Sequence, residues 1–242
     1  MNKNEIVGHI IKMLPKKILI HLVKLKNIAF DGFYLKSYSQ EGEDMILRRI
    51  FENQKTGFYV DVGAHHPKRF SNTYHFYKKG WSGINVDAMP GSTNLFNKIR
   101  PRDINLEIAI SDARETRTYY IFNEPALNGF SKELSVARNG LNNYKIILEK
   151  EIETKTLYEV LEKYLQKDQS IDFMSIDVEG MDYKVLKSND WGKYRPKIIL
   201  IEILDLDLNN TMNNKIYKYL HDLKYGFYAK TANTVIFKDL KA

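Results

Sequence analysis

Apolar residues follow two different patterns along this chain of 242 residues. Near the N-terminus they recur three or four positions apart, which is the spacing of an amphipathic helix: Ile6, Ile10, Met13 and Leu14, then Ile18, Leu22 and Leu25. Pro15 lies between these two groups, and proline interrupts a helix. We therefore predict two short helices in an N-terminal segment, residues 1–36, ahead of a main domain at residues 37–242.

From residue 57 onward, short apolar runs that suit β-strands alternate with helical stretches. The expected strands are 57–62, 83–87, 104–110, 173–177 and 198–203, followed by a closing antiparallel hairpin at 227–230 and 234–238. The expected helices are 73–79, 92–99, 156–165, 183–186 and 213–223, several of them preceded by Ser, Thr or Asn caps. This alternation predicts a layered α/β domain with a mostly parallel sheet.

Residues 117–153 interrupt the alternation. This stretch contains one strand-like run, at 118–122, and five asparagines in a polar context. We interpret it as an insertion that forms part of an acceptor pocket, and the alternative is a surface excursion without a function.

Composition limits the cellular location and the partners that we expect for this chain. The chain has no cysteine, which rules out disulfides and thiolate metal sites and favours a cytoplasmic location. The net charge of +7 favours acidic partners, but no nucleic-acid-binding motif is present, so we expect no nucleic acid partner. The N-terminal segment, residues 1–30, combines lysines with an apolar stripe. It can lie on an anionic membrane surface, or pack on the domain or on a second subunit.

Two strand ends suggest an adenosine cofactor. The run Phe58 to Ala64 is an apolar strand that ends in Asp61 and Gly63, at the first strand-to-loop junction. Asp87 ends the next strand, where a carboxylate can accept both hydroxyls of a ribose. The loop after the first strand lacks the Gly-x-Gly-x-x-Gly turn that holds a pyrophosphate. A cofactor without phosphates is therefore favoured over NAD.

A third strand end carries the candidate chemistry. Residues 171–180 form an apolar strand followed by Asp177 and Glu179. Asp177 can act as a general base toward an acceptor hydroxyl, bind a divalent cation, or cap the following helix. Glu202, near the end of the next strand, can add a second carboxylate for either catalysis or a cation.

Several motifs, in this order along the chain, resemble the FkbM-like methyltransferases. They are residues 37–44 (Ser-Tyr-Ser-Gln-Glu-Gly-Glu-Asp), 58–67, 71–74 (Ser-Asn-Thr-Tyr), 80–87 and 176–180 (Ile-Asp-Val-Glu-Gly). The resemblance extends from about Ser37 to Phe237. This chain differs from commoner members of the family in the pair His65-His66. It also has Asp87-Ala88-Met89 where Glu-Pro is frequent.

The resemblance implies a class I methyltransferase with a Rossmann-like fold, built on a mostly parallel seven-stranded sheet with a C-terminal antiparallel hairpin and helices on both faces. It implies S-adenosylmethionine as cofactor, with Asp61 and Gly63 on the methionine side and Asp87 at the ribose. Further candidates for cofactor binding are Gln40, Asp44, Asn72, Ala109, Ser111 and Asp112. Many relatives O-methylate sugars, so we expect a saccharide acceptor in a surface polysaccharide, a glycolipid or a nucleotide-linked sugar.

The sequence indicates the residues that contact the acceptor less clearly than those that bind the cofactor. After Asp177, His65 or His66 is the next candidate for the base, because imidazole titrates near neutrality. Arginine grips phosphate or carboxylate groups, so Arg69, Arg100 and Arg102 point to an anionic acceptor, with Glu179 as a further contact. The alternative is that these arginines form ion pairs between surface elements.

Rival functions remain open at this stage. They are a noncatalytic cofactor-binding or membrane-peripheral module, a secondary-metabolite O-methyltransferase and a dehydrogenase. A homo-oligomer is compatible with the sequence.

Overall fold

The computed structural model describes residues 15–30 and 32–241. The chain divides into two compact units, Met1–Lys36 and Ser37–Ala242, and each is described by itself. In the first unit, α2 (Lys16–Ala29) begins directly after Pro15 and has no buried residue. Proline suits this position because its missing N–H is not needed before the first turn. The other helix expected in this segment, over Ile6 to Leu14, lies outside the described residues.

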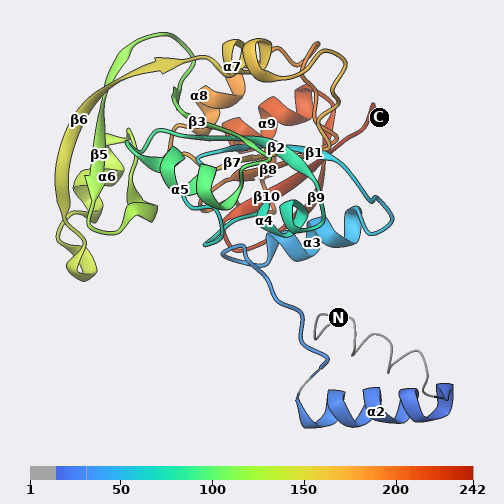
Figure 1. Cartoon of the computed structure of the whole chain (residues 1–242). Helices are drawn as coiled ribbons and strands as arrows, with labels where there is room; N and C mark the ends of the chain where they lie inside the picture. The colour runs from blue at the N-terminus through green and yellow to red at the C-terminus, as the bar shows by residue number, and fades with distance from the viewer. Residues whose placement is uncertain (1–14, 31, 242) are drawn as a thin grey trace. The chain divides into compact units, whose positions relative to one another are not determined.

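The larger unit is built on a sheet of seven strands in the order β3-β2-β1-β7-β8-β10-β9 (Figure 1). The strands are β1 (Phe58–Val62), β2 (Ser82–Asp87), β3 (Ile104–Glu107), β7 (Phe173–Ile176), β8 (Ile198–Glu202), β9 (Tyr225–Lys230) and β10 (Thr234–Asp239). Neighbouring strands are parallel except where β10 pairs with β8 and with β9. This confirms the predicted seven-stranded, mostly parallel sheet with an antiparallel C-terminal hairpin.

Helices cover both faces of this sheet, which explains why β1 and β7 are almost uninterrupted apolar runs. On one face, α7 (Leu157–Tyr164), α8 (Asp182–Lys187) and α9 (Lys215–Asp222) pack on Val60, Val62 and Ile84. On the other face, α3 (Glu43–Ile50) and α4 (Tyr74–Lys78) pack on Tyr59 and Phe173. Figure 1 shows α5 (Ser92–Ile99) on the same side as α3 and α4.

The predicted strand 104–110 is two strands. β3 ends at Glu107, and β4 (Ala109–Ile110) pairs with β6 (Ile146–Lys155) in a second sheet. Between them, the Ile108 amide donates a hydrogen bond to the Asp87 carbonyl, 3.0 Å away. The strand-like pattern continues through residues 104–110, but the chain changes partners beside the end of β2.

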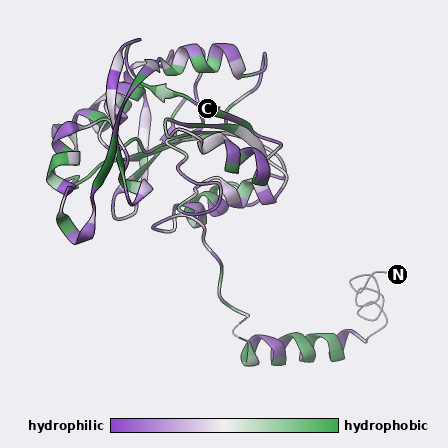
Figure 2. Ribbon diagram, turned by 60° about the vertical axis from the view of Figure 1, so that its left-hand side comes forward, coloured by the Kyte–Doolittle hydropathy of each residue, from purple (hydrophilic) through white to green (hydrophobic). Residues whose placement is uncertain are grey.

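The insertion is more regular than the sequence indicated. β5 (Thr116–Phe122) and β6 form an antiparallel pair, and with β4 they make a three-stranded sheet. Helix α6 (Lys132–Arg138) and two 3-10 turns lie between these strands. Figure 1 shows this insertion to one side of the main sheet, beyond β3, and in Figure 2 polar and apolar positions mix along it.

Candidate functional site

A cavity opens at the carboxyl ends of β1, β2 and β7. It holds about 1000 Å³ of empty space including its open mouth, a size suited to a small ligand. Strand-end residues on its wall are Asp61, Gly63, Asp87 and Asp177. The insertion contributes Tyr119, Pro125, Ala126, Asn128, Gly129 and Phe130. Strand ends and insertion therefore face a common space, as expected for a doubly wound sheet.

Gly63 brings the loops after β1 and β7 into close contact. Its φ is +82°, and a Cβ placed on it would lie 1.7 Å from the Asp177 carbonyl oxygen. Backbone hydrogen bonds hold the same junction: the Gly63 amide donates to Val86, and the Asp177 amide donates to Val62. Only glycine fits here, because both the conformation and the space exclude a side chain.

Asp87 organises the loops on both sides of it. Its Oδ2 accepts the His65 amide at 2.7 Å, and its Oδ1 accepts the Met89 amide at 2.7 Å. Burial raises the pKa of Asp87 to about 6, although the two backbone donors act in the opposite direction. Each carboxylate oxygen has a second lone pair, so Asp87 can accept hydrogen bonds from a ligand as well.

Asp61 is buried and connects to a charged network behind the strand ends. Thr73 donates to Asp61 Oδ2 at 2.8 Å, and the fully buried Arg100 donates to Thr73 at 3.0 Å. Arg100 also pairs with Asp103 at 2.8 Å and donates to the Tyr59 hydroxyl at 2.9 Å. Burial raises the pKa of Asp61, and the positive charge of Arg100 opposes that rise.

The three arginines expected to bind an anionic acceptor do not line the cavity. Arg100 has no exposed surface, so it cannot contact an acceptor. Arg102 donates to the carbonyls of Tyr77 and Trp81, away from the cavity. Arg69 is held by Glu124 through two hydrogen bonds at the surface. The structure does not support the predicted anion-binding set, because each arginine already has acceptors within the protein.

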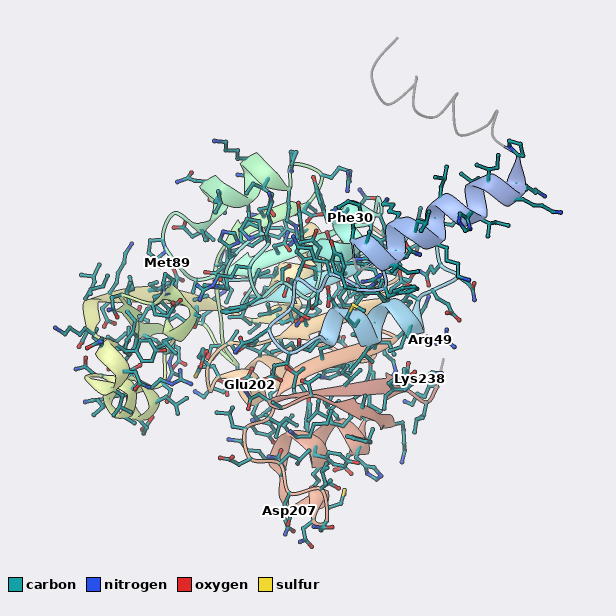
Figure 3. All side chains as sticks on the ribbon, turned by 90° about the horizontal axis from the view of Figure 1, so that it is seen from below. Phe30, Arg49, Met89, Glu202, Asp207 and Lys238 are labelled. Atoms are coloured by element: carbon teal, nitrogen blue, oxygen red, sulfur yellow. The ribbon has the colours of Figure 1, made fainter. Side chains whose placement is uncertain are left out.

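Asp177 and Glu202 share a second, smaller cavity that adjoins the first. Within the described residues, no hydrogen-bond donor contacts either carboxylate. Asp177 is open to the cavity but surrounded by protein on its other sides, and this loss of bulk water, with the nearby charge of Glu202, raises its pKa well above the usual value. Burial and neighbouring carboxylates raise the pKa of Glu202 to about 8. Figure 3 labels Glu202 at the end of β8.

Glu179 ties the loop after β7 to the insertion. Its carboxylate accepts a hydrogen bond from Arg138 of α6 at 2.6 Å. Its φ is +53°, which is uncommon outside glycine, and Gly180 follows with a φ of +94°. Burial raises the pKa of Glu179, and Arg138 opposes that rise. Glu179 lines the first cavity, so this pair forms part of its wall.

The two histidines have different positions. His65 lines the cavity, and its buried Nε2 has no hydrogen-bond partner within the described residues. Burial, with help from Arg69, lowers the pKa of His65 to about 4, so its ring is neutral at pH 7. His66 lines no cavity, and its Nδ1 accepts the backbone amides of Lys68 and Arg69. His66 therefore shapes the loop.

Among the residues ahead of the first strand, Gln40 lines both cavities, whereas the fully buried Asp44 lines neither. Asp44 accepts hydrogen bonds from Ser37, Ser39 and the Tyr38 amide, so it fixes the segment that carries Gln40.

Asn72 also lines both cavities. It donates to Ser175 at 3.0 Å, and its buried Oδ1 has no partner within the part of the chain that the structure describes.

The residues expected near an adenine lie beside the cavity wall. Ile108 and Ile110 line the cavity, whereas Ala109, Ser111 and Asp112 do not. The Ser111 hydroxyl contacts Asp112, which is also 3.4 Å from Lys184.

Sequence reasoning missed the apolar cavity residues Met89, Tyr119 and Phe130. The alternation of Tyr119 and Ile121, which pack into one apolar cluster, is the signal that could have revealed this wall.

The structure gives no support for the expected binding of a divalent cation. Within residues 15–30 and 32–241, no group of three or more His, Asp or Glu side chains could hold a metal ion. Asp177 and Glu202 remain a pair without a third ligand of this kind.

The sequence and the fold were compared with those of known proteins. Residues 61–227 match the model of a family described as the methyltransferase FkbM domain. A search of curated proteins gives no match. An O-methyltransferase from Bacillus cereus, solved in complex with SAH, aligns with 93% of this chain and 91% of its own, at 12% identity and a TM-score of 0.41. A candidate RNA methyltransferase from Pyrococcus horikoshii aligns with 89% and 98%, at 10% identity and a TM-score of 0.43.

Proposed function

The chain belongs to the FkbM methyltransferase family, and from this premise we propose that it transfers a methyl group from S-adenosylmethionine to a hydroxyl of a saccharide. The observation that carries the proposal is the cavity at the carboxyl ends of β1, β2 and β7. All of its lining residues except Gln40 lie within the matched range, and it adjoins a second cavity. The first has room for the cofactor, and the second for an acceptor beside it.

The charge of the first cavity fits this cofactor. Among the described residues, no lysine or arginine lines it, whereas Asp61, Asp87, Asp177 and Glu179 do. S-adenosylmethionine has a positive sulfonium and a positive ammonium group, which acidic side chains attract. The pyrophosphate of NAD would face the same four carboxylates without a cation, so the cavity disfavours a dehydrogenase.

Individual residues suit the parts of the cofactor. Asp87 has free lone pairs at the tip of β2, where a ribose binds in folds of this kind. The unpaired Oδ1 of Asn72 and the amide of Gln40 suit the polar amino-acid end. Met89, Ile108 and Ile110 offer apolar surface to a base.

When bound, S-adenosylmethionine supplies an electrophilic methyl group, so the protein has to orient the acceptor oxygen and remove its proton. Asp177 suits the second task. Its raised pKa makes it a stronger base than an ordinary carboxylate, and it lines both cavities. His65 is less suited because its pKa of about 4 makes the ring a weak proton acceptor.

The acceptor pocket favours neutral hydroxyl groups over an anion. In the described part of the chain, its acidic lining residues are Glu41, Glu43, Asp177 and Glu202, with no basic side chain among them. Glu41 and Glu43 already accept hydrogen bonds from the turn at Thr231–Thr234, whereas Asp177 and Glu202 are free to accept hydroxyl donors. A saccharide supplies such donors, and a phosphate or uronate group would be repelled.

Calorimetric titration tests the cofactor. We expect micromolar binding of S-adenosylmethionine and none of NAD. The Asp87→Asn variant should lose at least tenfold in affinity, while Asp112→Asn, an acid outside the cavity, should bind normally. Preference for NAD, or equal losses in the two variants, would contradict the proposed cofactor site.

Release of S-adenosylhomocysteine over a panel of saccharides tests the acceptor. We expect turnover with neutral sugars and little with matched uronates or sugar phosphates. A preference for the anionic partners, or turnover that depends on an amine or carboxyl acceptor, would contradict the proposal.

A further inference from the structure

Helix α2 exposes a full apolar side. Ile18, Leu22, Val23 and Leu25 are each about half exposed, at 48%, 48%, 48% and 52%, and no residue of the helix is buried. At 100° per residue, Ile18, Leu22 and Leu25 project within about 60° of one another, and Val23 lies at the edge of the same side. In Figure 2 most of the ribbon of this helix has the colour of hydrophobic residues. An apolar side of this size is typical of a binding surface.

The opposite side of α2 is basic. Lys17, Lys24 and His21 project there, Lys16 lies at its edge, and the exposed Ile20 and Ile28 lie among them. The sequence of the helix contains no acidic residue. Lys26 lies on the apolar side, where its long stem allows the ammonium group to reach outward. The helix therefore combines apolar contact area with four positive charges, and a partner that fits it is apolar with an anionic boundary.

Aromatic and apolar residues continue after the helix. Phe30, Phe33, Tyr34 and Leu35 are between 65% and 77% exposed, and Figure 3 labels Phe30 at the end of α2. Aromatic side chains are enriched where the acyl chains of a bilayer meet its headgroups. The apolar surface of this unit thus has the composition of a membrane-interface element.

The length of α2 sets its orientation toward a bilayer. No helix in the described part of the chain is long and apolar enough to cross a membrane. With 14 residues, α2 extends roughly 21 Å, which is less than the hydrocarbon thickness of about 30 Å. We propose that residues 16–35 bind to an anionic lipid surface, with α2 lying in the plane of the interface and its lysines contacting the headgroups.

Cosedimentation of the full chain with vesicles tests this surface. We use phosphatidylcholine vesicles with and without 30% phosphatidylglycerol. We expect binding to the anionic vesicles that weakens as salt is added. Replacing Lys16, Lys17, Lys24 and Lys26 by Gln should lower the partition coefficient about fivefold per lysine.

Substitutions on the apolar side of α2 provide a second test in the same vesicle assay. Leu22→Asp with Leu25→Asp should abolish binding to both kinds of vesicle. The matched control is Val136→Asp with Leu141→Asp, two similarly exposed apolar residues of the larger unit, which should bind as the unchanged protein does.

Undiminished sedimentation of the α2 variant would overturn the proposal. Light scattering that shows a dimer dissociated by the same variant would assign the helix to a second copy instead. A lowered melting temperature of that variant would assign the helix to the larger unit. Cofactor affinity is measured without vesicles, so failure of this inference is distinguishable from failure of the proposed methyltransferase activity.

Discussion

Asp103 precedes β3 at the amino end of the sheet, and Asp177 follows β7 at the carboxyl end, yet the protein surrounds these two acids in opposite ways. Asp103 accepts hydrogen bonds from the Tyr59 hydroxyl, the Gly83 amide, the Asn85 amide group and Arg100, at 2.8 to 3.0 Å. Asp177 has no such donor within the described residues, and its nearest charged influence is another acid, Glu202.

The difference separates stability from function. A buried charge is tolerated when it is paired and hydrogen-bonded, as around Arg100, and it then holds β1, β2 and β3 in register. Asp177 is exposed to the cavity, so without donors from the protein it keeps its lone pairs for a ligand. In this fold the Arg100–Asp103 pair lies behind the site, whereas Asp177 and Glu202, which have no donor within the described residues, line it.

Removing Arg100 should have the largest effect on stability. The Arg100→Met variant leaves Asp103 buried without its cation, and we expect a loss of about 3–5 kcal/mol in the free energy of unfolding. Urea unfolding followed by circular dichroism measures this loss. Arg102→Met, which removes an exposed neighbour, should cost less than about 1 kcal/mol. Equal losses would show that Arg100 is not the centre of the network.

Matched substitutions of the two acids should give opposite results. Asp103→Asn should destabilise the fold by roughly 2 kcal/mol or more, because it leaves Arg100 buried with less compensation. Asp177→Asn should leave the free energy of unfolding unchanged or slightly higher, while turnover falls by about 10²–10⁴. Unfolding curves and S-adenosylhomocysteine release measure the two effects. A fully active Asp177→Asn variant would remove this residue from the mechanism.

The raised pKa of Glu202 predicts a pH dependence of stability. The folded protein holds a proton on Glu202 up to about pH 8, whereas the unfolded chain releases it near 4.5, the ordinary pKa of a glutamate. The native state therefore binds more protons between these values, and stability should decrease as pH rises through this window. Urea unfolding at pH 5, 6.5 and 8 measures the decrease. The Glu202→Gln variant should show a smaller one, and an identical slope would contradict the assignment.

Breaking the contact between α6 and the loop after β7 should have a smaller effect. Arg138→Gln removes the partly buried pair with Glu179 and should cost about 1 kcal/mol while raising the KM for S-adenosylmethionine, because Glu179 lines the first cavity. The control is Arg69→Gln, whose pair with Glu124 is more exposed and should contribute about 0.5 kcal/mol or less. Steady-state kinetics and unfolding curves distinguish them. An unchanged KM in both variants would separate the insertion from cofactor binding.

The sequence was most informative at the strand ends. Apolar runs that end in an acid predicted β1, β2 and β7 to within a residue, because strands buried on both faces have few polar positions. Asp61, Gly63, Asp87 and Asp177 then share one cavity because parallel strands bring their carboxyl ends to one edge.

The partners of charged residues could not be predicted. Arginine is usually exposed, and only the packing of distant strands shows that Arg100 lies between Tyr59 and Asp103. In the same way, β6 is a ten-residue strand with mostly exposed, charged side chains, so it lacks the apolar alternation by which strands are identified. Its pairing with β5 became visible only in three dimensions.

The position of Gln40 has a consequence for biosynthesis. Hydrogen bonds of the neighbouring residues fix the position of Gln40. Glu41, which follows it, accepts hydrogen bonds from Asn233, which lies 192 residues later in the chain. At a translation rate of roughly 5–20 residues per second, Glu41 is synthesised about 10–40 s before its partner exists. The cofactor cavity therefore cannot acquire its final wall until β9 and β10 have emerged, and a nascent chain that stalls before them would fold its first strands without a functional site.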